Sequence, residues 1–187
     1  MSTVLSSFLH VGILFGTFVA TGEATTVVRF EFDSLCAQAE TIVYARCIDK
    51  ASFLDDDRIV TRTRFEVLEK IKGTTDTQVV LTMPGGQVEG NRLHIPGIPQ
   101  FQPGEELVLF LSKPDAHGSP WPMGLGQGCY RAREDDQNRP SILLQRGYTP
   151  LPYSVLSKAV TDRPFKLPLR QFLSQVRRSL SSPADAR

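Results

Sequence analysis

From Arg58 to Glu69 the chain alternates, residue by residue, between two kinds of side chain. One set is mostly apolar or β-branched and the other is mostly charged: the first is Ile59, Thr61, Thr63, Phe65, Val67 and Glu69, and the second is Val60, Arg62, Arg64, Glu66 and Leu68. Successive side chains of a strand point to opposite faces of a sheet, so this pattern predicts one long, half-buried β-strand. The acidic run Asp55–Asp57 directly before it predicts a solvated turn, and therefore a hairpin with a strand over residues 41–53.

The rest of the chain predicts more strands and two helices. Further strands are expected at residues 77–83, 87–95, 106–111, 128–133 and 141–145. The 106–111 run is apolar throughout, which indicates burial on both faces. A short helix capped by Asp33 or Ser34 runs through residues 37–40, and residues 167–180 carry apolar side chains at helical spacing. Gly 14 and Pro 13 make about one residue in seven, a turn-rich composition, and no β-α-β alternation occurs, so the pattern predicts a mainly β barrel or sandwich.

The N-terminal segment predicts export. Residues 4–20 are largely apolar, and Gly22 and Ala24 place small residues where a signal peptidase cleaves. The predicted organisation is a signal peptide over residues 1–24, a β domain over 25–146, and a linker with a C-terminal amphipathic helix over 147–187. The expected location is secreted or periplasmic, without a stable membrane span after cleavage. Because residues 1–10 contain no Lys or Arg, an uncleaved anchor or a wrongly assigned start codon remain alternatives.

The charge and the reactive residues exclude several classes of site. The net charge is +1, so no strong positive field attracts nucleic acid. His94 and His117 are too far apart in sequence for a typical metal pair, and the glycines of residues 124–128 lead into a strand rather than a helix, so neither a metal nor a nucleotide cofactor is expected. In an oxidising compartment, Cys36, Cys47 and Cys129 predict one disulfide and one odd thiol.

Two segments then carry a resemblance to a known family. They are residues 35–46, Leu-Cys-Ala-Gln-Ala-Glu-Thr-Ile-Val-Tyr-Ala-Arg, and residues 64–73, Arg-Phe-Glu-Val-Leu-Glu-Lys-Ile-Lys-Gly. Together they resemble the start of netrin-like domains, which include the tissue inhibitors of metalloproteinases. Residues 30–180 are also similar to uncharacterised exported bacterial proteins, through Gly85–Gly86, Gly90, the glycine, proline and phenylalanine pattern of residues 97–105, and Leu109–Leu111.

The resemblance implies a small OB-like β-barrel with a short N-terminal helix and a C-terminal helix. It also implies a disulfide between Cys36 and Cys129, although pairing of either with Cys47 stays open. The inhibitors chelate the protease zinc through an N-terminal cysteine. Here the expected N-terminus is Thr25, so that mechanism does not carry over.

These observations predict an exported binding module without catalytic activity, whose partner is a protein of the envelope or extracellular space. The expected contact surfaces are the loops at residues 87–101 and 115–127, where Phe101 and Trp121 act either as exposed contacts or as plugs of the barrel. Three alternatives are a metalloprotease-associated or inhibitory protein, an enzyme with Cys129 as nucleophile and His94 or His117 as base, and a purely structural envelope protein.

Overall fold

The computed structural model describes residues 29–74, 76–144, 150–152 and 164–182. The predicted signal peptide and most of the predicted linker therefore lie outside the described residues. The helices are α1 (Phe32–Gln38), the 3₁₀ turn η1 (Leu125–Gly128) and α3 (Leu169–Ser181). The strands are β1 (Thr41–Asp55), β2 (Arg58–Lys72), β3 (Gln78–Pro84), β4 (Gly86–Val88), β5 (Asn91–Leu93), β6 (Glu106–Leu111), β7 (Cys129–Glu134), β8 (Pro140–Leu144) and β9 (Phe165–Pro168).

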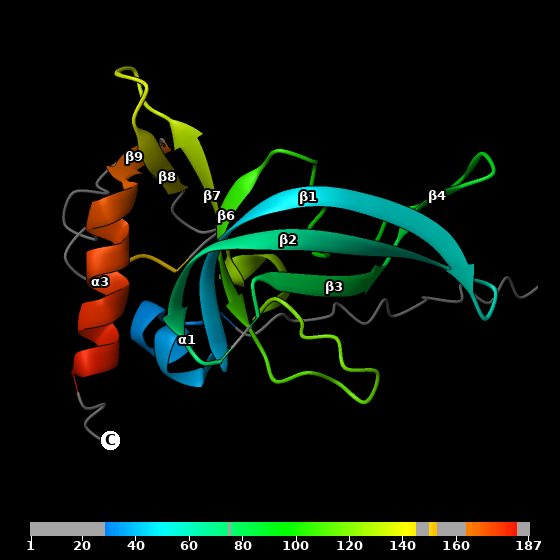
Figure 1. Ribbon diagram of the computed structural model, residues 1–187, viewed down its shortest axis with the longest axis horizontal. Coiled ribbons are helices and arrows are strands. Elements are labelled where there is room, and N and C mark those ends of the chain that lie inside the picture. The colour runs from blue at the N-terminus through cyan, green and yellow to red at the C-terminus, as the bar shows by residue number, and fades with distance from the viewer. Residues whose placement is uncertain (1–28, 75, 145–149, 153–163, 183–187) are drawn as a thin grey trace, which may run out of the picture.

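Seven strands form one antiparallel sheet in the order β3-β2-β1-β6-β7-β8-β9, and β4 and β5 form a separate hairpin. The predicted mainly β class is thus confirmed. The predicted closed barrel is not found: among the described residues β3 and β9 are the two edges, and no strand pairing joins them. Figure 1 shows β1 and β2 as long curved strands, with α1 and α3 gathered at one end and the β4 hairpin at the other.

The predicted hairpin between the first two long strands is confirmed. Asp56 and Asp57 form its turn with φ values of 45° and 61°. With two consecutive residues in the left-handed region, the twist of the turn matches the right-handed twist of the strands that it joins. Along β2 the predicted alternation also holds, because Thr63 and Phe65 are buried while Arg62, Arg64 and Glu66 are exposed.

The single strand expected at residues 87–95 is wrong, because this segment forms a hairpin of two short strands. Residues 87–95 were expected to run as a single strand, but Glu89 and Gly90 have φ values of 49° and 84°, and they reverse the chain between β4 and β5. A left-handed pair of this kind makes a tight two-residue turn, with glycine at the second position at no steric cost. The result is a short hairpin that projects beyond the main sheet (Figure 1).

Apolar side chains form one cluster on each face of the sheet. The first cluster lies under α1 and α3 and includes Phe32, Phe110, Tyr130 and Phe172. The second lies in the curve of the long strands and includes Val43, Ala45, Phe65, Leu81, Met83, Phe101, Leu107, Leu109, Leu111 and Cys129. Strand β6 contributes to both clusters, which confirms its predicted burial on both faces. The described part of the chain contains no helix that is long and apolar enough to cross a membrane.

Candidate functional site

Of the two aromatic residues predicted as contacts, Phe101 belongs to the second cluster and Trp121 packs against it. Phe101 is only 2% exposed, and its ring meets the ring of Phe65 edge to face at a centroid distance of 5.0 Å. Trp121 is partly buried, and its indole N–H donates to Asp115 Oδ2 over 3.3 Å. Phe101 is therefore a core side chain of the second cluster, and no closed barrel exists among the described residues for it to plug.

A groove of about 530 Å³ opens beside Phe101, at the end of the sheet away from the helices. We call it the hairpin groove, because the β4–β5 hairpin forms one of its walls. The second half of β1, the first half of β2, the end of β3 and the loop at residues 98–102 form the rest. Its lining residues are Lys50, Ser52, Thr61, Thr63, Met83, Pro84, Gly85, Gly86, Gln87, Glu89, Gly90, Arg92, Ile98, Pro99, Gln100, Phe101 and Gln102.

The floor of the hairpin groove continues the inner face of β2, but with hydroxyl groups in place of apolar side chains. Phe65 belongs to the apolar cluster, and the next two inward residues towards the turn are Thr63 and Thr61. Thr63 is 1% exposed, and its hydroxyl has no hydrogen-bond partner among the described residues. Among the described residues, Ser141 Oγ is the one fully buried polar side-chain atom without a partner, so the Thr63 hydroxyl still reaches the groove and is available to a ligand.

An irregularity in β1 brings Lys50 and Ser52 to the same floor. The pairing of β1 with β2 shifts between Cys47 and Asp49, so one residue of β1 is left without a partner. After such a bulge, the alternate residues point to the other face of the sheet. Cys47 lies opposite Phe65, and beyond the shift Lys50 lies opposite Thr63. The sequence analysis missed Lys50 and Ser52 because it treated β1 as an uninterrupted strand.

The hairpin wall crosses the long strands closely at Gly86. Ser52 donates to the hydroxyl of Thr61 over 2.8 Å, and Thr61 donates to the carbonyl of Gly85 over 2.6 Å. Gly86 has a φ of +133°, and a Cβ atom there would lie 2.3 Å from Thr61 Oγ1 and 2.4 Å from Ser52 Oγ. Only glycine fits this position, so the Gly85–Gly86 pair sets the position of the wall.

The hairpin groove also presents two cations. Lys50 Nζ donates to Gln102 Oε1 over 2.9 Å, and Arg92 lies exposed on β5. Neither forms an ion pair with a carboxylate in the described part of the chain, although Glu89 lies on the same wall. Two positive groups above a polar floor suit a ligand that carries a negative charge.

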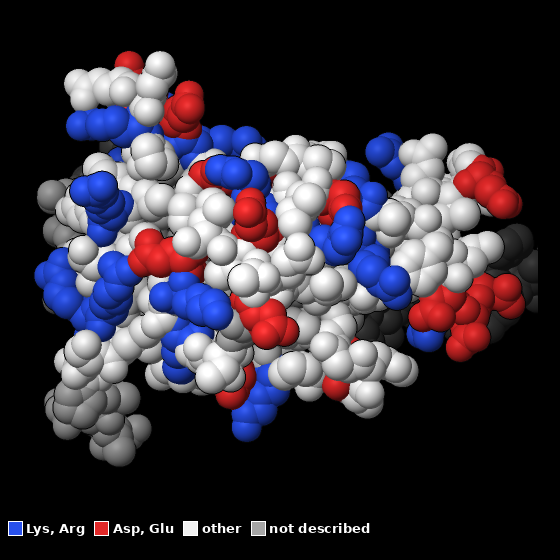
Figure 2. Space-filling view, in the orientation of Figure 1, with Lys and Arg blue, Asp and Glu red and all other residues white. Residues whose placement is uncertain are grey.

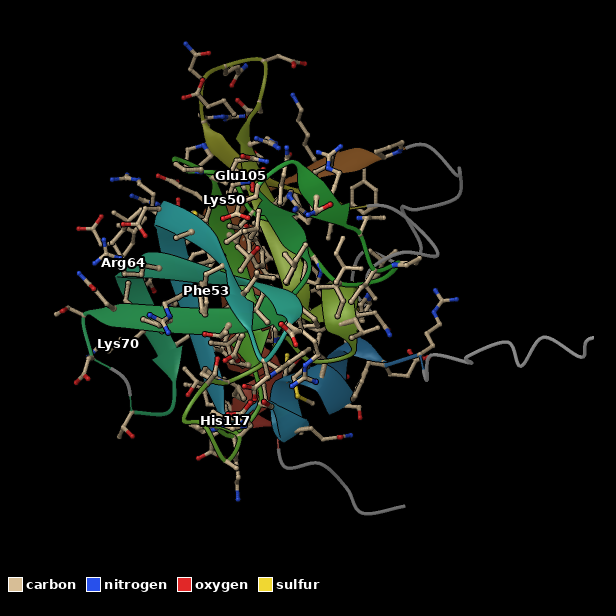
Figure 3. The ribbon with its side chains drawn as sticks, turned by 90° about the vertical axis from the view of Figure 1, so that its right-hand side faces the viewer. Lys50, Phe53, Arg64, Lys70, Glu105 and His117 are labelled. Carbon is tan, nitrogen blue, oxygen red and sulfur yellow. The ribbon has the colours of Figure 1, made fainter. Side chains whose placement is uncertain are left out.

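The outer face of the same strands carries both paired and unpaired charges, because Arg62 there packs on the Phe53 ring at 5.1 Å and forms no ion pair among the described residues. Arg46 Nη2 lies 2.8 Å from Glu106 Oε1, and Arg64 forms an ion pair with Asp49. The hydrogen bond from the Arg64 guanidinium holds the pKa of the Asp49 carboxyl below its ordinary value. Figure 2 shows basic and acidic side chains intermixed over this part of the surface, and Figure 3 shows Arg64 further out than Lys50.

The predicted disulfide between Cys36 and Cys129 is not present, because all three cysteines are buried free thiols. Cys36 belongs to the first cluster and Cys129 to the second, so the two side chains lie on opposite faces of the sheet. The β7 residue that faces the cluster of Cys36 is Tyr130, one position further along the chain. Because side chains alternate along a strand, that offset of one residue turns Cys129 away.

The surroundings of Cys129 do not resemble those of a nucleophile. Burial raises the pKa of the Cys129 thiol to about 12, so it stays protonated at neutral pH. The two candidate bases are exposed: His94 lies beside Gln100, with 3.3 Å between Nδ1 and the amide nitrogen, and His117 lies in the loop after Asp115. The described residues contain no cluster of three or more His, Cys, Asp or Glu side chains that could hold a metal ion.

Comparisons with protein-family models, with curated proteins and with solved structures found no match to this chain.

Proposed function

We propose that this chain is a binding module that recognises another protein through the hairpin groove. The observation that carries the proposal is the unpartnered hydroxyl of Thr63, which opens into the floor of a groove that also holds the cations Lys50 and Arg92, neither of which has an ion-pair partner among the described residues. A group that enters the groove gains a hydrogen bond from Thr63 without displacing an internal partner. If that group belongs to a segment of the partner that also carries a carboxylate, the carboxylate would form ion pairs with Lys50 and Arg92.

The proposal includes the location and the partner class expected from the sequence. The N-terminal apolar segment supports export, which would place the partner in the envelope or the extracellular space. The resemblance to netrin-like domains, with their OB-like barrel, supports recognition of a protein. A metalloprotease is the partner class that this resemblance implies, and the same groove variants test it.

Site-specific photo-crosslinking tests the proposal. A photoreactive amino acid replaces Gln87 on the wall of the hairpin groove in one protein, and Leu143, an exposed residue of β8, in a control protein. Each is expressed in the native host, irradiated and purified, and the crosslinked partners are identified by mass spectrometry. We expect one stoichiometric partner from position 87 and none from position 143. Equal labelling of the same proteins from both positions would contradict the proposal.

Affinity measurements with the captured partner then test the chemistry of the groove. Lys50→Ala and Arg92→Ala should each weaken binding by about 10-fold or more, since a hydrogen bond to a charged group contributes about 1.5–3 kcal/mol. Thr63→Val keeps the shape of the side chain and removes the hydroxyl, so it should weaken binding while the protein stays folded. Lys113→Ala, which lies outside the groove lining, is the matched control and should bind normally. Unchanged affinity in all three groove variants would exclude the hairpin groove as the contact site.

A further inference from the structure

The free edge of β3 has backbone groups that point away from the sheet. Among the described residues, strand β3 pairs only with β2, and it is the first strand in the sheet order. The Val67 amide donates to the Thr77 carbonyl over 2.8 Å, which makes residues 77, 79 and 81 the ones that bond to β2. In an antiparallel pair the residues between them direct their N–H and C=O groups outward. Gln78 and Val80 are therefore the outward-facing residues.

One part of this edge is closed and the other is open. The next outward residue, Thr82, donates its amide to Ser119 Oγ over 2.9 Å, so the loop around Ser119 already completes the edge there. No hydrogen bond in the described part of the chain engages the outward backbone groups of Gln78 or Val80. Beside them lies a second groove of about 440 Å³, which we call the edge groove. Natural sheets commonly protect such an edge, because its open groups accept another strand.

The lining of the edge groove suits one extended segment. The end of β6 contributes Leu111 to it, and the loop that follows contributes Pro114 and Pro120. Ser119 of this loop accepts the Thr82 amide, so the loop lies beside the same edge and leaves less room for a second folded sheet than for a single segment. Asp76 also lines the groove and has no ion-pair partner among the described residues, which favours a basic side chain on the segment.

We propose that the open edge of β3, at Gln78 and Val80, binds an extended segment of a partner protein as an added β-strand. The outward donor and acceptor of each of these residues pair with the backbone of the segment, as in other cases of strand addition. The apolar wall accepts β-branched side chains, and Asp76 pairs with a Lys or Arg. The edge groove shares no lining residue with the hairpin groove, so this proposal stands or fails independently of the function proposed above.

The test uses the purified protein and the peptide acetyl-Lys-Thr-Val-Thr-Val-Thr-Lys-amide as the probe. Binding is measured by fluorescence anisotropy, and amide exchange is followed by NMR. We expect saturable binding and slower exchange of the Gln78 and Val80 amides. The Thr82 amide is an internal control, because it already donates to Ser119 and should not change. A version of the peptide with alternate amides N-methylated should not bind.

Two variants at position 80 separate the contribution of the backbone N–H to peptide binding from that of the side chain. Val80→Pro removes an N–H that does not bond to β2, so the β2–β3 ladder is kept, as for proline at other sheet edges. This variant should weaken peptide binding by at least about 10-fold, because it removes a hydrogen bond and places the proline ring between the two strands. Val80→Thr keeps the N–H and should bind like the unmodified protein. If Val80→Pro does not fold, the N-methylated peptide decides.

Several outcomes would overturn this proposal. The first is a peptide that does not bind, and the second is equal binding of the N-methylated peptide. A third is a concentration-dependent dimer that protects the Gln78 and Val80 amides without any peptide, since it would assign the edge to a second copy of this chain. Loss of partner binding through the hairpin groove would leave the proposal intact, because that result concerns other residues.

Discussion

At the scale of single residues, two buried serines differ in whether their hydroxyl has a partner. Ser141 is buried on β8, and its Oγ has no hydrogen-bond partner among the described residues. Ser119 is also buried, but its Oγ accepts the amide of Thr82. An unsatisfied buried hydroxyl destabilises the native state, whereas a satisfied one stabilises it. The two serines should therefore respond in opposite directions to the same substitution.

Ser141→Ala should raise the free energy of unfolding by about 1 kcal/mol, because it removes a buried polar atom that makes no bond. Ser119→Ala should lower it by about 1 kcal/mol, because it leaves the Thr82 amide without an acceptor. Urea denaturation of the two variants and the unmodified protein measures both changes. A fall in stability for Ser141→Ala would mean that its hydroxyl has a partner after all.

At the scale of the elements, the loop at residues 98–102 packs on the sheet through the side chain of Phe101. Phe101 is fully enclosed against Phe65, whereas Trp121 is only partly buried. Phe101→Ala should lower the free energy of unfolding by about 3–5 kcal/mol, as large-to-small changes in cores do. Trp121→Ala should cost less, about 1–2 kcal/mol, since part of the indole already contacts water. Chemical denaturation measures both, and equal costs would contradict the role of Phe101 as a core side chain.

The turn between β7 and β8 depends on one carboxylate. Asp135 Oδ1 accepts the amides of Gln137 and Arg139 at 2.8 and 3.0 Å, and Oδ2 accepts Arg139 Nε at 2.9 Å. These bonds, led by the Arg139 amide, lower the pKa of Asp135 to about 2. Because the folded pKa lies below the unfolded value of about 3.9, the carboxylate stabilises the fold above about pH 4. That contribution is lost as the pH falls towards 2.

Asp135→Asn keeps an oxygen acceptor but has no charge to lose, so it is the matched control for this turn. The difference in unfolding free energy between the unmodified protein and Asp135→Asn should shrink between about pH 4 and pH 2. Chemical-shift titration of the Asp135 carboxyl should give a midpoint near the lowered pKa. A stability difference that stays constant over this pH range would contradict the role of the charge.

At the scale of the whole molecule, the periodic parts of the fold could be predicted and the irregular parts could not. The alternation of β2 and the apolar run of β6 predicted their burial, because side-chain direction follows directly from the strand period. The shift after Cys47 could not be predicted, because a bulge leaves no mark in composition. That single shift turns Lys50 and Ser52 into the hairpin groove. The face of the sheet towards which Cys129 points could not be predicted either, because it depends on the register of β7.

The positions of the three cysteines make a prediction about the whole native state. Cys36, Cys47 and Cys129 are buried as free thiols in two separate clusters, and burial raises the pKa of Cys36 and Cys129 to about 12. A disulfide reagent that reacts with thiolates should therefore react slowly with the native protein at pH 8, and with three thiols after unfolding. The variant Ile48→Cys places a thiol at an exposed position and should react quickly in the native state. Fewer than three thiols in the unfolded, unreduced protein would reveal a disulfide and contradict the separation of Cys36 from Cys129 by the sheet.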